Sequence, residues 1–248
     1  MEKDLYYFVS DVHLGLEVGD AVLRERKFAS FLSSLPQNTK ALYLLGDIFD
    51  FWYEYRNVIP RRFTRTLGAL ASLVDRGVEV YFFNGNHDIW TYSYFEQEIG
   101  MKILQQPYIV DIAGKRFCLG HGDGLGKGDF GYKLLNGTFK SRFLQWLFSG
   151  VHPRWAFGLA HLWSKHNRLA HEDNPWEWRG KDERIVKFAQ SLQQERGGDI
   201  DYFIFGHFHN RTQIELDGGA RMYILGEWIH NFDYIVFDGK ECHSLNIE

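Results

Sequence analysis

The sequence predicts an α/β fold in which a largely parallel sheet is followed by a second, mixed or antiparallel sheet. Three observations support this prediction. Strand-like and helix-like segments alternate between residues 5 and 83, hairpin-like strand pairs follow residue 108, and residues 129–194 contain few strand signals. We therefore expect one domain over residues 1–248, with a helical insertion at 129–194 within it.

The predicted parallel sheet depends on short apolar runs rich in β-branched and aromatic residues, each leading into a polar cluster. The runs are Leu5–Val9, Ala41–Leu45, Val78–Phe83, Phe117–Leu119 and Tyr202–Phe205. Between the early runs, Ala21–Leu32 and Arg61–Val74 carry apolar residues at the three- and four-residue spacing of helices. Strands joined by helices pair in parallel, and such sheets bind ligands beyond the carboxyl ends of their strands. The polar clusters are therefore the expected site.

The second sheet is predicted from turn signals after residue 108. Strand pairs are expected around Ala113-Gly114, around Asp217-Gly218-Gly219 and around Asn231, and the chain closes with YIVFDGKECHSLNIE. Strands joined by short turns of this kind form hairpins, so we expect them to build a sheet separate from the first.

Composition excludes several classes of protein. With 45% hydrophobic and 17% aromatic residues the chain is not disordered, and its net charge of −4 argues against binding nucleic acid through bulk electrostatics. Cys118 and Cys242 are too few for a disulfide framework. The amino terminus does not read as a signal peptide, and no run of about 18 apolar residues is present. We expect an intracellular, soluble protein, attached at most to a membrane surface.

The polar clusters contain a set of oxygen and nitrogen donors. They are Asp11, His13, Asp47, Asn86, His121, His207 and His209. Singly, such residues shape turns, cap helices or form structural hydrogen bonds. Together, at converging strand ends, they predict two metal sites that share a bridge, for which the two oxygens of Asp47 are suited.

The donor types indicate the metal and the reaction. Four imidazoles with three oxygen donors favour a pair of first-row transition ions over calcium or magnesium. Two such ions clamp the attacking and leaving oxygens of a phosphoryl displacement and lower the pKa of bound water. We expect two divalent ions, with Mn²⁺ preferred and Fe, Zn or Mg as alternatives.

The segments DVH, GDIFD, GNHD, GHGD and GHFH, in this order, resemble the five motifs of the calcineurin-like metallophosphoesterases. The resemblance implies a two-sheet β-sandwich flanked by helices and a hydrolase with two metal ions. It assigns Asp11, His13 and His209 to one ion and Asn86, His121 and His207 to the other, with Asp47 bridging. It also implies that His87 protonates the leaving oxygen or contacts the phosphate, and that Asp88 orients His87.

Three further stretches narrow the resemblance. SDVHLG, HGDGLGKGDFGYK and RMYILGEWIHNFDYIVFD are similar to segments of the UDP-2,3-diacylglucosamine diphosphatases of lipid A synthesis. That family cleaves the diphosphate to give UMP and 2,3-diacylglucosamine 1-phosphate (lipid X). The match implies that Asp129 and Tyr132 contact the substrate head group, and that Lys165, Asn167 and Arg168 reach phosphate or acyl-sugar groups.

The insertion favours a lipid substrate on separate grounds. Residues 143–167 are apolar and heavily aromatic, with basic residues at Arg142, Arg154, Lys165 and Arg168. An amphipathic helical pair with basic flanks is typical of a lid over acyl chains or of a contact with an anionic membrane. Ordinary core-facing helices are the alternative. We expect a lid and peripheral contact with the cytoplasmic face of the inner membrane, and no nucleic-acid partner.

The chain also departs from the narrower family. His87 replaces the usual arginine, Phe208 replaces a threonine, and Glu227 stands where aspartate is usual in a Gly-Asp-Trp motif. His87 matches the wider superfamily and favours broader phosphoester specificity. A phosphodiesterase or phosphomonoesterase, or another UDP-sugar or nucleotide diphosphatase, is the alternative function. A scaffold without activity is disfavoured because the whole donor set is present.

Overall fold

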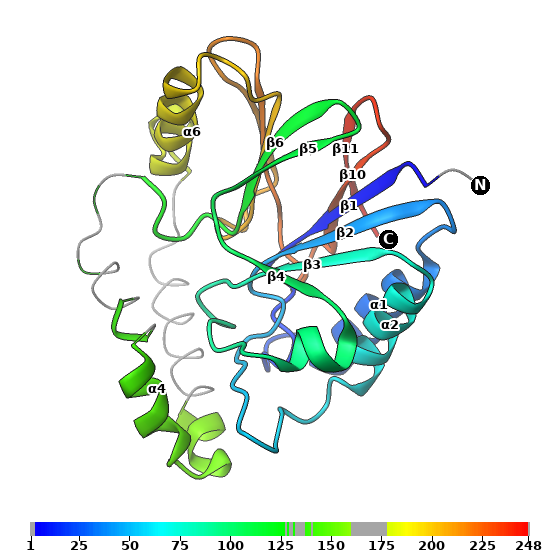
Figure 1. Cartoon of the computed structure of the whole chain (residues 1–248), viewed down its shortest axis with the longest axis vertical. Helices are drawn as coiled ribbons and strands as arrows, with labels where there is room; N and C mark the ends of the chain where they lie inside the picture. Colours follow the sequence, from blue (N-terminus) through cyan, green and yellow to red (C-terminus); the bar gives the residue numbers. More distant parts are fainter. Residues whose placement is uncertain are drawn as a thin grey trace.

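A computed structural model of the chain describes residues 3–126, 128, 131, 137–139, 141–159 and 178–247. It contains two sheets with helices on their outer sides (Figure 1). The strands of the first sheet, in spatial order, are β11 (Cys242–Asn246), β10 (Asp233–Phe237), β1 (Leu5–Val9), β2 (Thr39–Leu45), β3 (Glu79–Phe83) and β4 (Lys102–Leu104). Those of the second are β5 (Tyr108–Ile112), β6 (Lys115–Gly120), β7 (Tyr202–Phe205), β9 (Arg221–Ile224) and β8 (Thr212–Glu215).

The parallel pairing expected of the early runs is confirmed in the first sheet, whereas the runs Phe117–Leu119 and Tyr202–Phe205 lie in the second, mixed sheet. Strands β1, β2, β3 and β4 pair in parallel, as do β6, β7 and β9. Helix α1 (Ala21–Ser34) joins β1 to β2, and α2 (Thr64–Asp75) joins β2 to β3. The Asp20 side chain caps α1 by accepting the N–H of Leu23 at 2.9 Å. A short π-helix, η1 (Phe95–Ile99), precedes β4.

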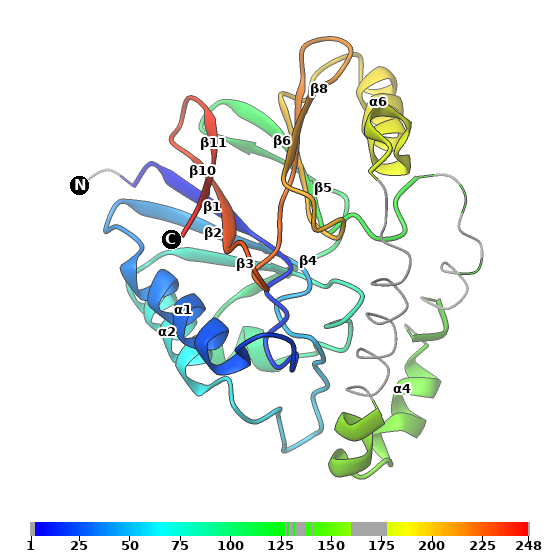
Figure 2. The same cartoon turned by 180° about the vertical axis from the view of Figure 1, so that it is seen from behind.

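Side chains alternate between layers along the strands, as the period of two in a strand requires. In β2, Tyr43 and Leu45 face the core between the two sheets, whereas Leu42 and Leu44 face α1 and α2. In the second sheet, Ile204 of β7 joins the same central core. Figures 1 and 2 show α1 and α2 covering the outer face of the first sheet from both views.

One part of the predicted topology is wrong. The strands on either side of Asn231 do not form a hairpin, because β9 lies in the second sheet and β10 lies in the first. Strand β10 pairs antiparallel with β1, and β11 pairs antiparallel with β10. The physical reason is packing: Ile235 and Phe237 fill the core between the sheets, while Val236 packs with the core beneath α1 and α2. The hairpins at Ala113-Gly114 and Asp217–Gly219 do lie in the second sheet.

The segment expected as an insertion contains helices with different surroundings. Helix α6 (Arg184–Glu195), preceded by a 3-10 turn η2 (Gly180–Asp182), packs through Ile185, Val186 and Ala189 on the outer face of the second sheet. Helix α4 (Arg142–Ser149) has no fully buried side chain and contacts the loops after β2 and β3 through Gln145 and Phe148. Within the described part of the chain, none of the helices is both long and apolar enough to span a membrane.

Candidate active site

The loops after five strands bring the predicted donors to one edge of the two sheets. The donors are Asp11 and His13 after β1, Asp47 after β2, Asn86 after β3, His121 after β6, and His207 and His209 after β7. Backbone hydrogen bonds join these loops to one another. His13 N donates to Asp47 O at 3.0 Å, and Gly206 N donates to His121 O at 2.8 Å. The convergence of parallel strand ends therefore gathers donors from both sheets.

The backbone at several donors is held in an uncommon conformation. Among the described residues, eight residues other than glycine have positive φ, and five of them are donors: Asp11, His13, Asp47, His207 and His209. Left-handed backbone at such residues costs free energy and persists where the surroundings enforce it, commonly at functional sites. At Gly206 the chains approach so closely that an added Cβ would lie 2.6 Å from Asp11 Oδ2. The left-handed backbone and the close packing of the loops together fix the orientation of the donor side chains.

The first group of donors is Asp11, His13 and His209, whose ligand atoms lie within 4.8 Å of one another. His209 Nε2 lies 3.0 Å from Asp11 Oδ1 and 3.2 Å from His13 Nε2. Two imidazole nitrogens and a carboxylate oxygen thus face one point, and Asp11 and His13 are almost fully buried. This donor chemistry fits a divalent transition ion.

The second group is Asp47, His121 and His207, again with ligand atoms within 4.8 Å. His121 Nε2 lies 3.3 Å from Asp47 Oδ2 and 3.3 Å from Asn86 Oδ1. His121 Nδ1 donates to Leu45 O at 2.8 Å, which turns Nε2 toward the other donors. Imidazole nitrogens with carboxylate and amide oxygens fit the same kind of ion.

Asp47 connects the two groups through one oxygen. Its Oδ2 lies 3.3 Å from His121 Nε2 and 3.9 Å from His13 Nε2. Its Oδ1 accepts the backbone N–H of His87 at 2.8 Å. From the sequence, the two oxygens were expected to divide between two ions, whereas in the structure Oδ2 faces histidines of both groups.

Burial and charge set the protonation of this cluster. Burial acts to raise the pKa of Asp47, but the His121 and His87 charges outweigh it and hold that pKa well below its usual value. Burial acts to lower the pKa of His121, yet the Asp47 carboxylate raises it well above the ordinary histidine value. Burial lowers the pKa of His13 and of His207 to about 4. These two histidines are therefore neutral at pH 7, the form that binds a metal.

Comparison with known proteins agrees with this geometry. The family model described as "Calcineurin-like phosphoesterase" matches residues 6–211, which include every donor. This chain belongs to the calcineurin-like phosphoesterase family.

Several similar proteins share one name. A protein named UDP-2,3-diacylglucosamine hydrolase from Porphyromonas gingivalis is 37% identical over 246 residues, covering 94% of each chain. Proteins of the same name from Neisseria meningitidis serogroup A and Aeromonas hydrophila are 30% and 28% identical, covering 98% and 92% of each chain.

In this phosphoesterase, the residue expected to orient His87 does not face its ring. Asp88 is fully buried, and its carboxylate accepts backbone N–H groups from Gly85 at 2.8 Å and from Ile48 at 2.8 Å. Further N–H groups of the loop after β2, from Asp47 and Phe49, lie 3.2 Å away. Asp88 therefore fixes the loop that carries Asp47, rather than the imidazole of its neighbour. Burial and Asp47 together raise the pKa of Asp88 to about 7.

The carboxylate beside His87 is Asp50, which the sequence analysis did not single out. His87 Nδ1 donates to the carbonyl oxygen of Asp50 at 3.0 Å and lies 3.5 Å from its Oδ1. His13 Nδ1 lies 3.4 Å from the same oxygen. The signal was present in the sequence, since Asp50 ends the quoted motif GDIFD.

The Gly226–Trp228 segment supports the first donor group. Trp228 N donates to the carbonyl oxygen of Asp11 at 3.1 Å, and its indole Nε1 donates to Asp233 O at 2.7 Å. The Glu227 carboxylate accepts the N–H of His230 at 3.0 Å and also that of Ile229, closing its own turn. Glu227 thus shapes the backbone.

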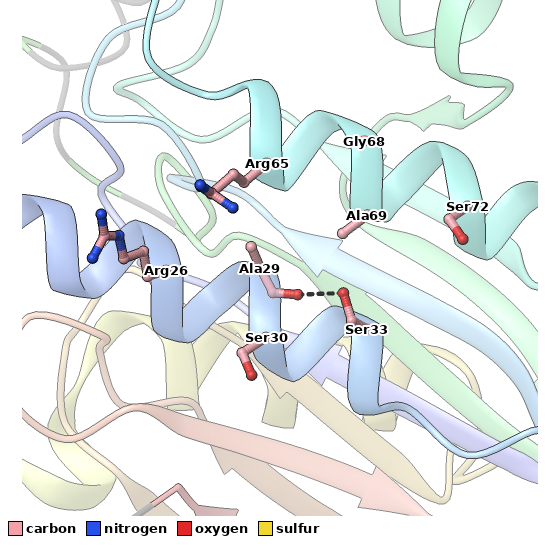
Figure 3. Close-up of a pocket in the computed structure, with 8 residues that line it drawn as sticks. All are labelled: Arg26, Ala29, Ser30, Ser33, Arg65, Gly68, Ala69 and Ser72. Carbon is pink, nitrogen blue, oxygen red and sulfur yellow. Dashed lines mark hydrogen bonds between the residues drawn. The ribbon is translucent and has the colours of Figure 1, made fainter.

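The predicted substrate contacts Asp129, Tyr132, Lys165, Asn167 and Arg168 lie outside the described residues. A surface groove lies between α1 and α2, and none of the donors lines it (Figure 3). It is lined by Arg26, Ala29, Ser30, Ser33, Arg65, Gly68, Ala69 and Ser72. This lining contains no carboxylate or imidazole, so the chemistry belongs to the donors at the strand ends.

Proposed function

We propose that this chain hydrolyses the diphosphate of UDP-2,3-diacylglucosamine, giving UMP and 2,3-diacylglucosamine 1-phosphate. The observation that carries the proposal is the pair of donor groups that meet at Asp47 Oδ2. The relatives named UDP-2,3-diacylglucosamine hydrolase cover nearly the whole chain and support the choice of substrate.

We assign the site residues two roles in the proposed reaction: binding metal ions and contacting the leaving phosphate oxygen. Bound divalent ions supply an activated water and neutralise charge on the phosphate. We assign Asp11, His13 and His209 to one ion and Asn86, His121 and His207 to a second, with Asp47 shared and Mn²⁺ as the expected metal. His87 Nδ1 is engaged by Asp50 O, which leaves Nε2 to contact the leaving phosphate oxygen.

The apolar face of α4 is a candidate surface for the acyl chains. Phe143 and Trp146 are 65% and 68% exposed, and Trp155, in the helical turn that follows, is 69% exposed. The opposite side of α4 is anchored: Tyr53 Oη donates to Gln145 O at 2.9 Å. Trp90, three residues after His87, donates to Phe139 O at 2.9 Å. A helix that is anchored beside the site and has an apolar outer face is suited to act as a lid. From the sequence, we propose that the substrate contacts are Asp129, Tyr132, Lys165, Asn167 and Arg168.

The same face supports peripheral contact with the cytoplasmic face of the inner membrane, where a diacylated substrate resides. Exposed aromatic residues beside Arg142 and Arg154 match a helix that lies in a membrane interface. Co-sedimentation with vesicles containing anionic lipid should be reduced in a Phe143→Ser/Trp146→Ser variant. The Val22→Ser/Leu23→Ser variant, which removes exposed apolar residues from α1, is the matched control.

The function is tested by supplying UDP-2,3-diacylglucosamine to the Mn²⁺-loaded protein and to an EDTA-treated sample and measuring UMP release. Metal-dependent release is the expected result. His87, in place of the arginine usual in the narrower family, favours a broader phosphodiesterase as the second candidate. Rapid hydrolysis of bis-p-nitrophenyl phosphate without hydrolysis of the lipid would support that candidate and contradict the proposed substrate.

A further inference from the structure

A small recess opens beside His207, on the side of the second sheet. Three segments line it: Gly122, Gly124 and Leu125 in the loop after β6, Arg184-Ile185 at the start of α6, and His207-Phe208. Since Gly122 follows the donor His121 and His207 is itself a donor, the recess adjoins the second donor group.

The loop that forms one wall of the recess contains two glycines with left-handed backbone. Gly122 and Gly124 have φ of +110° and +65°, conformations that residues with a side chain rarely adopt. A Cβ at Gly122 would lie 3.6 Å from the Phe208 ring. Asp123, the acidic residue between these glycines, is buried and accepts a hydrogen bond from Gln106 Nε2 at 2.5 Å, and it does not line the recess.

The other walls supply a cation and aromatic surface. Arg184 lies on the exposed side of the first turn of α6 and is the cationic side chain in the lining. The ring of Phe208 packs edge-on against His207, with centroids 5.3 Å apart, and against Trp178, with centroids 5.7 Å apart. A guanidinium recognises phosphate oxygens, and an aromatic ring provides a stacking surface for a base.

The recess and α4 lie on different sides of the donors. Helix α4 contacts the loops after β2 and β3, at Tyr53 and Trp90, whereas the recess is lined by the loops after β6 and β7 and by α6. Both cartoon views place α6 beside the second sheet and α4 apart from it (Figures 1 and 2). The side of the site at α4 exposes apolar side chains, and the side at the recess has the cationic Arg184 next to the Phe208 ring. The substrate of the proposed function has the same asymmetry, with acyl chains at one end and a nucleotide at the other.

We propose that the recess binds the nucleoside monophosphate half of the substrate, with Arg184 at its phosphate and Phe208 beneath its base. This inference rests on the proposed function for the identity of the nucleotide. It sets the direction of the substrate across the site, with the nucleotide toward α6, and with the lipid toward α4 and His87.

The test measures the affinity of UMP for the Mn²⁺-loaded protein by titration calorimetry, together with the affinity of 2,3-diacylglucosamine 1-phosphate. Arg184→Ala should weaken UMP binding by about 10- to 100-fold, the loss of a charge-assisted hydrogen bond, and change lipid binding less than about twofold. Arg184→Lys should restore part of the loss. Lys187→Ala, an exposed cation one turn further along α6, should leave UMP affinity unchanged.

Two further variants distinguish a specific loss of nucleotide binding from a general loss of folding. Phe208→Thr should weaken UMP binding at least about fivefold through lost stacking. Trp146→Ser on α4 should weaken the lipid product and spare UMP. Equal UMP affinity in wild type and Arg184→Ala, or a loss in Arg184→Ala that falls on the lipid product instead, would overturn the proposal.

The experiments can reject the proposed lipid substrate and the proposed nucleotide site independently of each other. If the protein binds UMP through Arg184 but does not hydrolyse UDP-2,3-diacylglucosamine, the nucleotide site stands and the lipid substrate is wrong. If it hydrolyses that lipid and Arg184→Ala binds UMP normally, the function stands and the recess is not the nucleotide site.

Discussion

The backbone N–H of His87 donates to Asp47 Oδ1 at 2.8 Å. This bond occupies one oxygen of the carboxylate and leaves Oδ2 turned toward histidines from both donor groups. If two ions bind as proposed, Asp47 would be the residue that serves both, and the ions would supply the activated water of two-metal hydrolysis. The relationship also joins the candidate acid to the candidate bridge, since a shift of the loop after β3 moves both.

Replacement of Asp47 by asparagine should remove the bridge while keeping the size of the side chain. The amide loses the negative charge that balances the ions. We expect bound Mn²⁺ to fall by at least one ion per chain and hydrolysis to fall by more than about 100-fold, because changes in outer partners alone cost about 10–100-fold. Elemental analysis of the purified variant and the UMP assay measure both. Asp217→Asn, in an exposed turn, is the control, and an unchanged metal content in Asp47→Asn would contradict the assignment.

Metal binding at neutral pH should release a proton from His121. Asp47 overcomes the effect of burial and raises the pKa of His121 well above its ordinary value, so the metal-free imidazole is protonated at pH 7. A metal binds only the neutral ring. The apparent affinity for Mn²⁺ should therefore rise with pH, by up to about tenfold for each pH unit per proton released, until the pH passes that pKa.

Titration calorimetry in buffers of different ionisation enthalpy measures this proton release directly. His13 and His207, whose pKa burial lowers to about 4, are already neutral at pH 7 and contribute no proton. An affinity for Mn²⁺ that does not change between pH 6 and pH 8 would show that the Asp47–His121 pair is not charged in the metal-free protein.

Asp50 should act by positioning the two rings beside it. Its Oδ1 lies 3.4 Å from His13 Nδ1 and 3.5 Å from His87 Nδ1. We expect Asp50→Ala to reduce kcat by about 10–100-fold, as is typical when the partner of a metal-binding histidine is removed. The Asp50→Ala/His87→Ala double variant should lose less than the product of the single losses, because Asp50 acts partly through His87. Strictly multiplicative losses with unchanged Mn²⁺ content would argue that Asp50 has no positioning role.

Gly226→Ala should destabilise the fold and disturb the first donor group. An added Cβ would overlap the carboxylate of Asp233, whose carbonyl oxygen accepts the Trp228 indole N–H. The Trp228 backbone N–H in turn supports Asp11. We expect a loss of about 1–3 kcal/mol in the free energy of unfolding, as for other overpacked sites. Urea unfolding measures this loss.

Gly68→Ala is the matched control for that change. An added Cβ at Gly68 meets nothing within 4 Å, and the residue lies inside α2. This variant should therefore be more stable than the wild type by about 0.5–1 kcal/mol. A Gly226→Ala protein as stable as Gly68→Ala would mean that the Trp228 segment tolerates displacement.

The sequence by itself determined the parallel strands, the helices between them and the donor set. Apolar runs such as Leu5–Val9 and Tyr202–Phe205 have the composition of buried strands, and each leads directly into polar residues at its carboxyl end. Because parallel strands expose their carboxyl ends at the same edge, the types and positions of these residues were enough to predict that they converge.

Only the tertiary structure decided how the distant parts meet. The alternation of Ile235, Val236 and Phe237 suits a strand of either sheet, and the pairing of β10 with β1 follows from which core their side chains fill. The orientation of the Asp47 carboxylate depends on a backbone N–H, a donor that nearly every residue type supplies and that no sequence motif marks. The backbone N–H of Trp228 that donates to the carbonyl oxygen of Asp11 is likewise marked by no sequence motif. The recess beside His207 forms because α6 packs on the second sheet.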